Sequence, residues 1–139
     1  QLKRLNIFKK KWKENKNKII DKLKKDPRWK NQFNFVRYSK KIDASYMVLP
    51  ILLDEKFRFI KREFIEKIES KGLETRPIIS GSFLNQPSAK LYKLNPKNYK
   101  FEGAQKIQDL GFVIGLHTKK ISNKQLNFVI NTLFSIERI

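Results

Sequence analysis

The sequence GLETRPIISGSFLNQP, residues 72–87, decides most about the fold. Gly72 closes a run of residues with helical spacing, so it stands where a left-handed helix cap is expected. Residues 73–79 are typical of a strand, and residues 80–82 form a polar turn cluster. The sequence therefore predicts a helix over residues 57–71, then a strand, then a loop of the kind that often carries function. The helical spacing is set by Phe57, Ile60, Phe64, Ile65 and Ile68.

A long amphipathic helix is predicted over residues 2–23, where apolar side chains recur with a 3.6-residue period. Its other faces are rich in lysine, and Pro27 ends it because proline restricts the residue before it. A mostly polar loop follows, with a short strand around residues 33–36. The apolar stripe consists of Leu5, Phe8, Trp12, Ile19 and Leu23.

Residues 46–53 are short and aliphatic, which favours a buried strand. Pro50 lies inside this run and has no N–H to donate to a strand ladder. We therefore expect this strand at a sheet edge or at a bulge.

The C-terminal part continues the alternation of helices and strands. A helical turn is expected over residues 88–92, a helix over 102–110 closed by Gly111, and a strand over 112–116. Ser122 and Gln125 form a capping box that begins the last helix. The chain thus predicts an α+β domain, a small antiparallel or mixed sheet covered by helices, without an internal repeat or boundary.

Composition excludes several classes of protein. The 139 residues contain no cysteine and one histidine, His117, which leaves neither a disulfide framework nor a cluster of metal ligands. The longest apolar run, residues 46–53, is far shorter than the roughly 20 residues that a membrane-spanning helix needs. We expect a cytoplasmic protein without a metal site.

The net charge of +19 is unevenly distributed, since residues 1–41 carry 16 Lys and Arg against 3 Asp and Glu. A basic stretch of this kind can bind nucleic acid through phosphate contacts. It can equally be the solvated face of a helix. A free-standing basic module that binds nucleic acid through residues 2–23 is therefore the alternative function.

Several motifs resemble the DegT/StrS family of pyridoxal-phosphate (PLP) dependent sugar aminotransferases. Residues 72–87 resemble the family's "G-I-E-T-R-P, S-G-N-F, Q-P" run, with Ser82 in place of the usual asparagine. Residues 105–118 resemble its "G-F-x-I-G-L-H" strand before the terminal helix. The opening QLKRL, residues 1–5, resembles the start of its linking helix. The resemblance is strongest to the nucleotide-sugar 3-dehydratase branch.

This resemblance implies that the chain is the C-terminal part of a type I aminotransferase fold. Residues 1–26 would be the linking helix and residues 27–139 the small domain, with PLP held mainly by a large domain outside these residues. The intact enzyme would be a homodimer acting on a nucleotide-linked 4-keto-6-deoxy sugar, by transamination or 3-dehydration, in lipopolysaccharide or polysaccharide biosynthesis. A truncated gene, a split enzyme and an incomplete reading frame each account for such a partial chain.

The resemblance also indicates substrate-binding residues and no catalytic residue. Arg76 is expected to clamp an anionic substrate group, although an ion pair with Glu74 is the structural alternative. Short polar side chains beside it suit sugar hydroxyls or a pyrophosphate, or serve only the turn. These side chains are those of Ser80, Ser82, Asn85 and Gln86. Gly81 between them lets the backbone turn or approach a ligand closely. His117, after an apolar strand, is expected at the periphery of the active site or as a structural residue.

Overall fold

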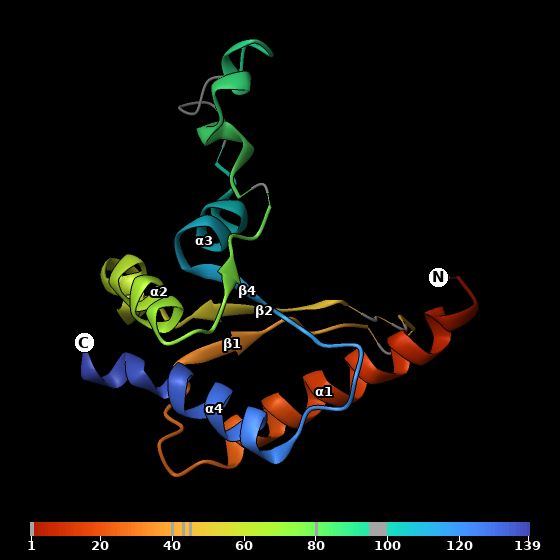
Figure 1. Cartoon of the computed structure of the whole chain (residues 1–139). Helices are drawn as coiled ribbons and strands as arrows, with labels where there is room; N and C mark the ends of the chain where they lie inside the picture. The colour runs from red at the N-terminus through yellow and green to blue at the C-terminus, as the bar shows by residue number, and fades with distance from the viewer. Residues whose placement is uncertain (1, 40, 43, 45, 80, 95–99) are drawn as a thin grey trace.

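The computed structural model of the chain describes residues 2–39, 41–42, 44, 46–79, 81–94 and 100–139. Helices and strands alternate along it, as the sequence predicts (Figure 1). The strands are β1 (Phe33–Phe35), β2 (Val48–Leu53), β3 (Thr75–Arg76) and β4 (Gly111–Gly115). The α-helices are α1 (Leu5–Lys25), α2 (Lys61–Ser70), α3 (Glu102–Leu110) and α4 (Asn123–Leu133). Short 3-10 helices are η1 (Leu2–Arg4), η2 (Glu55–Ile60), η3 (Phe83–Asn85), η4 (Pro87–Lys90) and η5 (Phe134–Arg138).

The strands of the described chain form one four-stranded sheet in the order β1-β2-β4-β3, and every neighbouring pair is antiparallel. The central pair aligns Leu49 with Ile114 and Ile51 with Phe112. Because side chains alternate along a strand, these four residues share one face, and all four are buried. The predicted small antiparallel sheet is confirmed.

Three helices cover this buried face. In Figure 1, α1 and α4 run side by side beneath the sheet. Helix α2 lies at the end of the sheet where the chain continues from β2. Phe64 of α2 makes the link, since its ring centroid lies 6.4 Å from Phe33 and 6.0 Å from Phe112. The core therefore joins the helices to both inner and outer strands. Its helical members include Ile19, Leu23, Ile68, Ile130 and Leu133.

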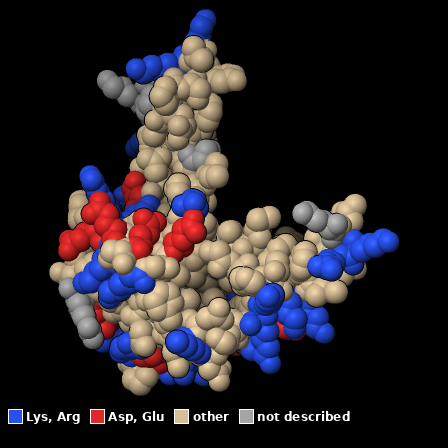
Figure 2. All heavy atoms as spheres, in the orientation of Figure 1, with Lys and Arg blue, Asp and Glu red and all other residues tan. Residues whose placement is uncertain are grey.

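The opposite face carries α3 and a projecting segment. We call residues 77–79, 81–94 and 100–101 the arm; it extends away from the sheet above α3 (Figure 1). Several of its apolar side chains are exposed, with Ile79 90% and Leu91 83% accessible. Figure 2 shows few charged atoms along the arm below its tip. The arm thus carries several apolar side chains that the rest of the described chain leaves uncovered.

The strand that contains Pro50 is central, so the expectation of an edge strand or bulge is wrong. Pro50 pairs with Val113 of β4, while β1 pairs with β2 only as far as Ile51. The Met47 carbonyl accepts from the Leu116 amide at 2.8 Å, and hydrogen-bonding direction alternates along a strand. The nitrogen of Pro50 therefore faces away from β4, just beyond the last paired residue of β1. An N–H is not needed there.

The strand predicted over residues 73–79 is shortened to β3, Thr75–Arg76. The pairing with β4 ends at Arg76, and the chain turns into the arm at Pro77. The helix ends, by contrast, follow the prediction. Gly72 has φ +92°, and Ser122 and Gln125 form the capping box at the start of α4.

Helix α1 is tied to the rest of the domain by polar as well as apolar contacts. Asn15, 1% exposed, hydrogen bonds to the loop that follows β4. At the other end, Asp26 accepts from the backbone and guanidinium of Arg28 at 2.7–3.0 Å. Within the part of the chain that the structure describes, no helix combines the length and apolar character needed to cross a membrane, and no group of three acidic or histidine side chains could hold a metal ion.

Replacing Gly111 should destabilise the fold. A Cβ at this position would lie 2.7 Å from Ile78 Cδ1 and closer still to the Ile107 carbonyl oxygen, which is backbone and cannot move aside easily. We expect Gly111→Ala to lower the free energy of unfolding by about 1–3 kcal/mol. Gly115→Ala is the matched control in the same strand, because no described atom lies within 4 Å of its added Cβ. Urea unfolding followed by circular dichroism compares the two; equal losses would contradict the prediction.

The contact between Asp26 and Arg28 should make the free energy of unfolding depend on pH in the acidic range. Hydrogen bonding from Arg28 lowers the pKa of Asp26 from 3.8 to about 2. A carboxyl with a lowered folded-state pKa stabilises the fold above its ordinary pKa, and this contribution is lost as the pH falls through the folded value. Asp26→Asn should therefore cost up to about 1 kcal/mol near neutral pH, and progressively less below the ordinary pKa. Urea unfolding at several pH values measures this, with the exposed Asp21→Asn as control; a difference that does not shrink in acid would refute it.

Candidate functional site

The loop predicted to bind substrate begins with a sharp turn after β3. The Gly81 amide donates to the Ile78 carbonyl at 3.0 Å, and Gly81 has φ +67°. Glycine adopts this left-handed conformation without steric cost, so the expected role of Gly81 in turning the backbone is confirmed. Ser80, another predicted site residue, lies outside the described residues.

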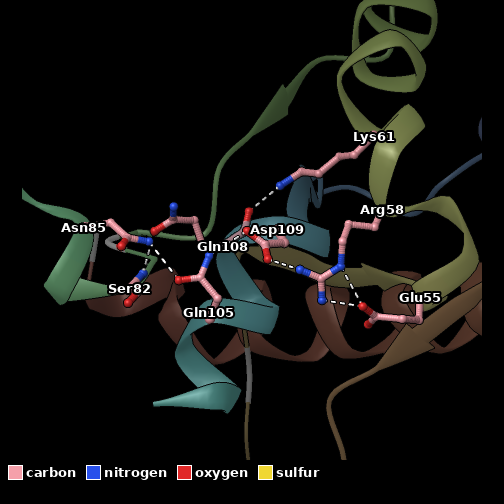
Figure 3. A network of polar contacts seen from close by, with 8 residues as sticks. All are labelled: Glu55, Arg58, Lys61, Ser82, Asn85, Gln105, Gln108 and Asp109. Atoms are coloured by element: carbon pink, nitrogen blue, oxygen red, sulfur yellow. Dashed lines mark hydrogen bonds and ion pairs between the residues drawn. The ribbon is translucent and has the colours of Figure 1, made fainter. Parts of the chain in front are cut away.

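Helix α3 holds this turn through Gln108 (Figure 3). Its side-chain oxygen accepts from the Ser82 amide at 2.9 Å, and a Cβ on Gly81 would lie only 3.0 Å from the same oxygen. Ser82 is 2% exposed, so its amide would otherwise be buried without a partner. The glutamine thus fixes the backbone of the loop, and only glycine at position 81 leaves room for it.

A second set of contacts continues outward from α3. Asn85 Nδ2 donates to Gln105 Oε1 at 2.8 Å, and Gln105 Nε2 donates to Asp109 Oδ1 at 2.8 Å. Asp109 is paired with Arg58 of η2, which also donates from Nε to Glu55 at 2.6 Å. A polar chain therefore runs from the loop, across α3, to η2 (Figure 3).

Charged side chains extend this series of polar contacts on the η2 side. The hydrogen bond with Glu55 raises the pKa of Arg58, with Asp109 adding to the effect, so the guanidinium stays charged. Lys61 donates to the Gln108 carbonyl at 2.7 Å. Burial lowers the pKa of Lys61, and the nearby Asp109 carboxylate opposes that change. These cations hold the C-terminal end of α3, where helix carbonyls favour positive charge.

The loop and α3 together enclose a cavity of about 410 Å³. Its apolar wall is formed by Pro77, Ile78 and Ile79 of the arm and by Ile107 of α3. We call it the loop cavity; its polar wall is formed by Asn85, Gln86 and Gln108. These groups offer amide donors and acceptors suited to hydroxyl groups of a ligand.

Two predicted site residues lie apart from this cavity. Arg76 is exposed on β3, where it pairs with Glu74 and donates to the Thr75 carbonyl at 3.1 Å. His117 lies beyond the other end of β4, where its Nδ1 accepts from the Lys119 amide at 2.9 Å. The structure thus brings together residues 81–86, while Arg76 stands at the base of the arm and His117 lies away from the loop.

Sequence reasoning missed the residues that position the loop. In the sequence, Gln105, Gln108 and Asp109 stand out only as part of the stretch 105–110 that resembles the family, and no role is predicted for them. Their spacing of three and four on a helix places them on one face, which was the available signal. Arg58 and Lys61 carried no such signal, because their contacts with α3 span 51 and 47 residues.

No protein-family model and no curated protein sequence matches the chain. Solved structures do match. The chain superposes on Escherichia coli GDP-4-keto-6-deoxy-D-mannose-3-dehydratase with bound hydrated PLP at a TM-score of 0.75 and 20% identity, over 95% of this chain and 32% of that one. PseC of Helicobacter pylori, an aminotransferase involved in the biosynthesis of pseudoaminic acid, matches at a TM-score of 0.79 and 17% identity, over 100% of this chain and 35% of that one.

These matches define the class of fold. The chain spans about a third of the length of each of these proteins. It has the fold of a part of PLP-dependent sugar dehydratases and aminotransferases, which confirms the predicted α+β small domain of that fold. The family resemblance seen in the sequence is thus supported at the level of fold.

Removing the side-chain amide of Gln108 should loosen the turn at Gly81. In a Gln108→Leu variant the buried Ser82 amide loses its acceptor, which costs about 1–3 kcal/mol locally. We expect the Ser82 amide to exchange with solvent at least about tenfold faster, measured by hydrogen exchange with NMR detection. Gln105→Leu is the control, because Gln105 contacts side chains of Asn85 and Asp109 and not the Ser82 amide. Equal acceleration in both variants would refute the assignment.

Proposed function

We propose that the chain is the C-terminal part of a PLP-dependent enzyme acting on a nucleotide-linked 4-keto-6-deoxy sugar, by transamination or 3-dehydration. The fold match carries this proposal, because nearly the whole chain superposes on both a sugar 3-dehydratase and a sugar aminotransferase. The ordered motif in residues 72–87 supports it, since these residues form the turn of the loop cavity. A related solved structure contains bound GDP-perosamine, which suits a nucleotide-sugar substrate.

In this proposal the chain contributes substrate binding. Asn85 and Gln86 line the loop cavity, and the Ser82 backbone is fixed by Gln108. Ser80 and the Ser82 hydroxyl would add contacts to sugar or phosphate oxygens. Because Gln108 holds the turn before any ligand arrives, little ordering is left for binding.

Arg76 would meet an anionic group of the substrate. The guanidinium and its partner Glu74 are both exposed, with side chains 69% and 74% accessible. An ion pair in solvent contributes little, so exchanging Glu74 for a phosphate costs little. A phosphate also offers the bidentate geometry that arginine prefers.

The loop cavity does not itself have the residues of a PLP site. PLP enzymes need a lysine or an equivalent base beside the cofactor and a partner for its ring nitrogen. Among the described residues, those lining the loop cavity include no Lys, Asp or Glu, and Lys61 is engaged with the Gln108 carbonyl. We therefore place the cofactor outside this chain, on the remaining two-thirds of the enzyme.

Further features follow from the same proposal. Residues 1–26 would link the cofactor-binding domain to the small domain of residues 27–139, with His117 at the periphery of the active site. The enzyme would be a cytoplasmic homodimer that serves lipopolysaccharide or polysaccharide biosynthesis. Nucleic acid would not be its partner.

The first test is to read the open frame upstream of the Gln1 codon and to express the whole protein. We expect a PLP-binding domain, and conversion of GDP-4-keto-6-deoxymannose, with PLP and glutamate, to a deoxygenated or aminated sugar detected by mass spectrometry. A histidine at the Schiff-base position would indicate 3-dehydration and a lysine transamination. A frame that encodes no such domain, together with steeply salt-dependent DNA binding, would instead support the nucleic-acid alternative.

In the whole enzyme, Arg76→Gln should weaken substrate binding. Loss of a charge-assisted contact of about 1.5–3 kcal/mol corresponds to a rise in KM of roughly 10- to 100-fold with a smaller change in kcat. Arg62→Gln is the matched control, because Arg62 is an exposed arginine paired with Glu66 at 2.9 Å on α2. Unchanged KM in Arg76→Gln, measured by steady-state kinetics, would remove Arg76 from the site.

A further inference from the structure

A second cavity, of about 530 Å³, lies at the opposite end of β4 from the loop cavity. Gly111, at the start of β4, lines the loop cavity, whereas Gly115, at its end, lines this one. It is bounded by α1, α4 and the loop of residues 117–121 that joins β4 to α4. We call it the second cavity; it shares no lining residue with the loop cavity, and of the predicted site residues only His117 lines it.

The floor of the second cavity is apolar. Its aliphatic side chains come from the core, and Phe128, 42% exposed, stands at its edge. A volume of this size falls in the range of small-molecule sites, which are mostly apolar with a few polar groups. The apolar members are Ile19, Leu73, Ile114, Leu116, Ile121 and Val129.

The rim is cationic. Lys119 and Lys120 line the cavity and are exposed, and His117 stands beside them. The lining residues within the described part of the chain include no Asp or Glu. A ligand that fits both parts must therefore carry an apolar body and an anionic head.

Asn15 holds this rim in place. Its Nδ2 donates to the His117 and Lys119 carbonyls at 2.9 and 2.7 Å, and its Oδ1 accepts from the Ile121 amide at 3.0 Å. With three bonds from one buried amide, the loop carrying the cations is fixed on α1. A site whose polar groups are already positioned binds with less loss of conformational entropy.

The loop also determines which ring nitrogen of neutral His117 carries the hydrogen. Because Nδ1 accepts from the Lys119 amide, the neutral imidazole carries its hydrogen on Nε2. The ring can therefore donate from Nε2 to an anion. Together with the two lysines, it gives the rim donors and no carboxylate.

We infer that the second cavity binds a small amphipathic anion, namely a carboxylate with an aliphatic tail of medium length. The tail lies on the apolar floor and the carboxylate meets Lys119 and Lys120. The charge of the rim selects the head group, and the floor supplies most of the contact area.

Calorimetric titration of the 139-residue protein with octanoate tests this inference. Octyltrimethylammonium has the same tail and the opposite charge, so it should bind at least about tenfold more weakly. Chemical shifts of amides in residues 114–121 and 128–129 should change with octanoate and report the location. Equal binding of the two probes, or octanoate shifts confined to other residues, would overturn the inference.

Two variants separate the head and tail contacts. The double variant K119E/K120E should weaken octanoate at least about tenfold, whereas K24E/K25E, with the same charge change in exposed lysines at the end of α1, should change it less than about twofold. Phe128→Ala should weaken the binding of both probes, because it removes apolar contact at the edge of the second cavity. Circular dichroism confirms that each variant folds. Equal losses in the two charge variants would show that only net charge matters and would overturn the inference.

Discussion

The antiparallel pairing of β2 with β4 is the constraint on which the rest of the structure depends. It places Ile51 opposite Phe112 and Leu49 opposite Ile114, and these side chains form the centre of the core. A slip of one residue would turn each of them to the other face. The same register sets the two ends of β4, so Gly111 lies against the loop and α3, and Gly115 lies near the loop fixed by Asn15.

Hydrogen bonds position the loop that lines the loop cavity. Gln108 holds the Ser82 amide, and Gln105 connects Asn85 to Asp109. Arg58 then fixes Asp109 from η2. A loop positioned in this way keeps its polar groups aimed before a ligand arrives, at the cost of needing every partner in the chain of contacts.

Local features could be predicted from the sequence, and contacts between distant segments could not. Gly72 and the Ser122 capping box were predictable because their signals lie within a few residues. The central position of Pro50 was not, since it depends on where β1 stops alongside β2. The role of Gln108 was hidden for the same reason, because its contact with Ser82 spans 26 residues. Asn85 and Gln86 line one cavity and Ser82 follows its turn at Gly81; the substrate-binding roles of the three residues stay a prediction.

The two outer strands are unusually short, three residues in β1 and two in β3. An exposed strand edge is a row of unpaired backbone donors and acceptors on which another chain can add a strand. Here each edge offers too few such groups to pair with an added strand. Pro77, which has no N–H, follows β3 directly. The early departure of the chain into the arm thus protects a sheet rich in aliphatic residues from growing by intermolecular strand addition.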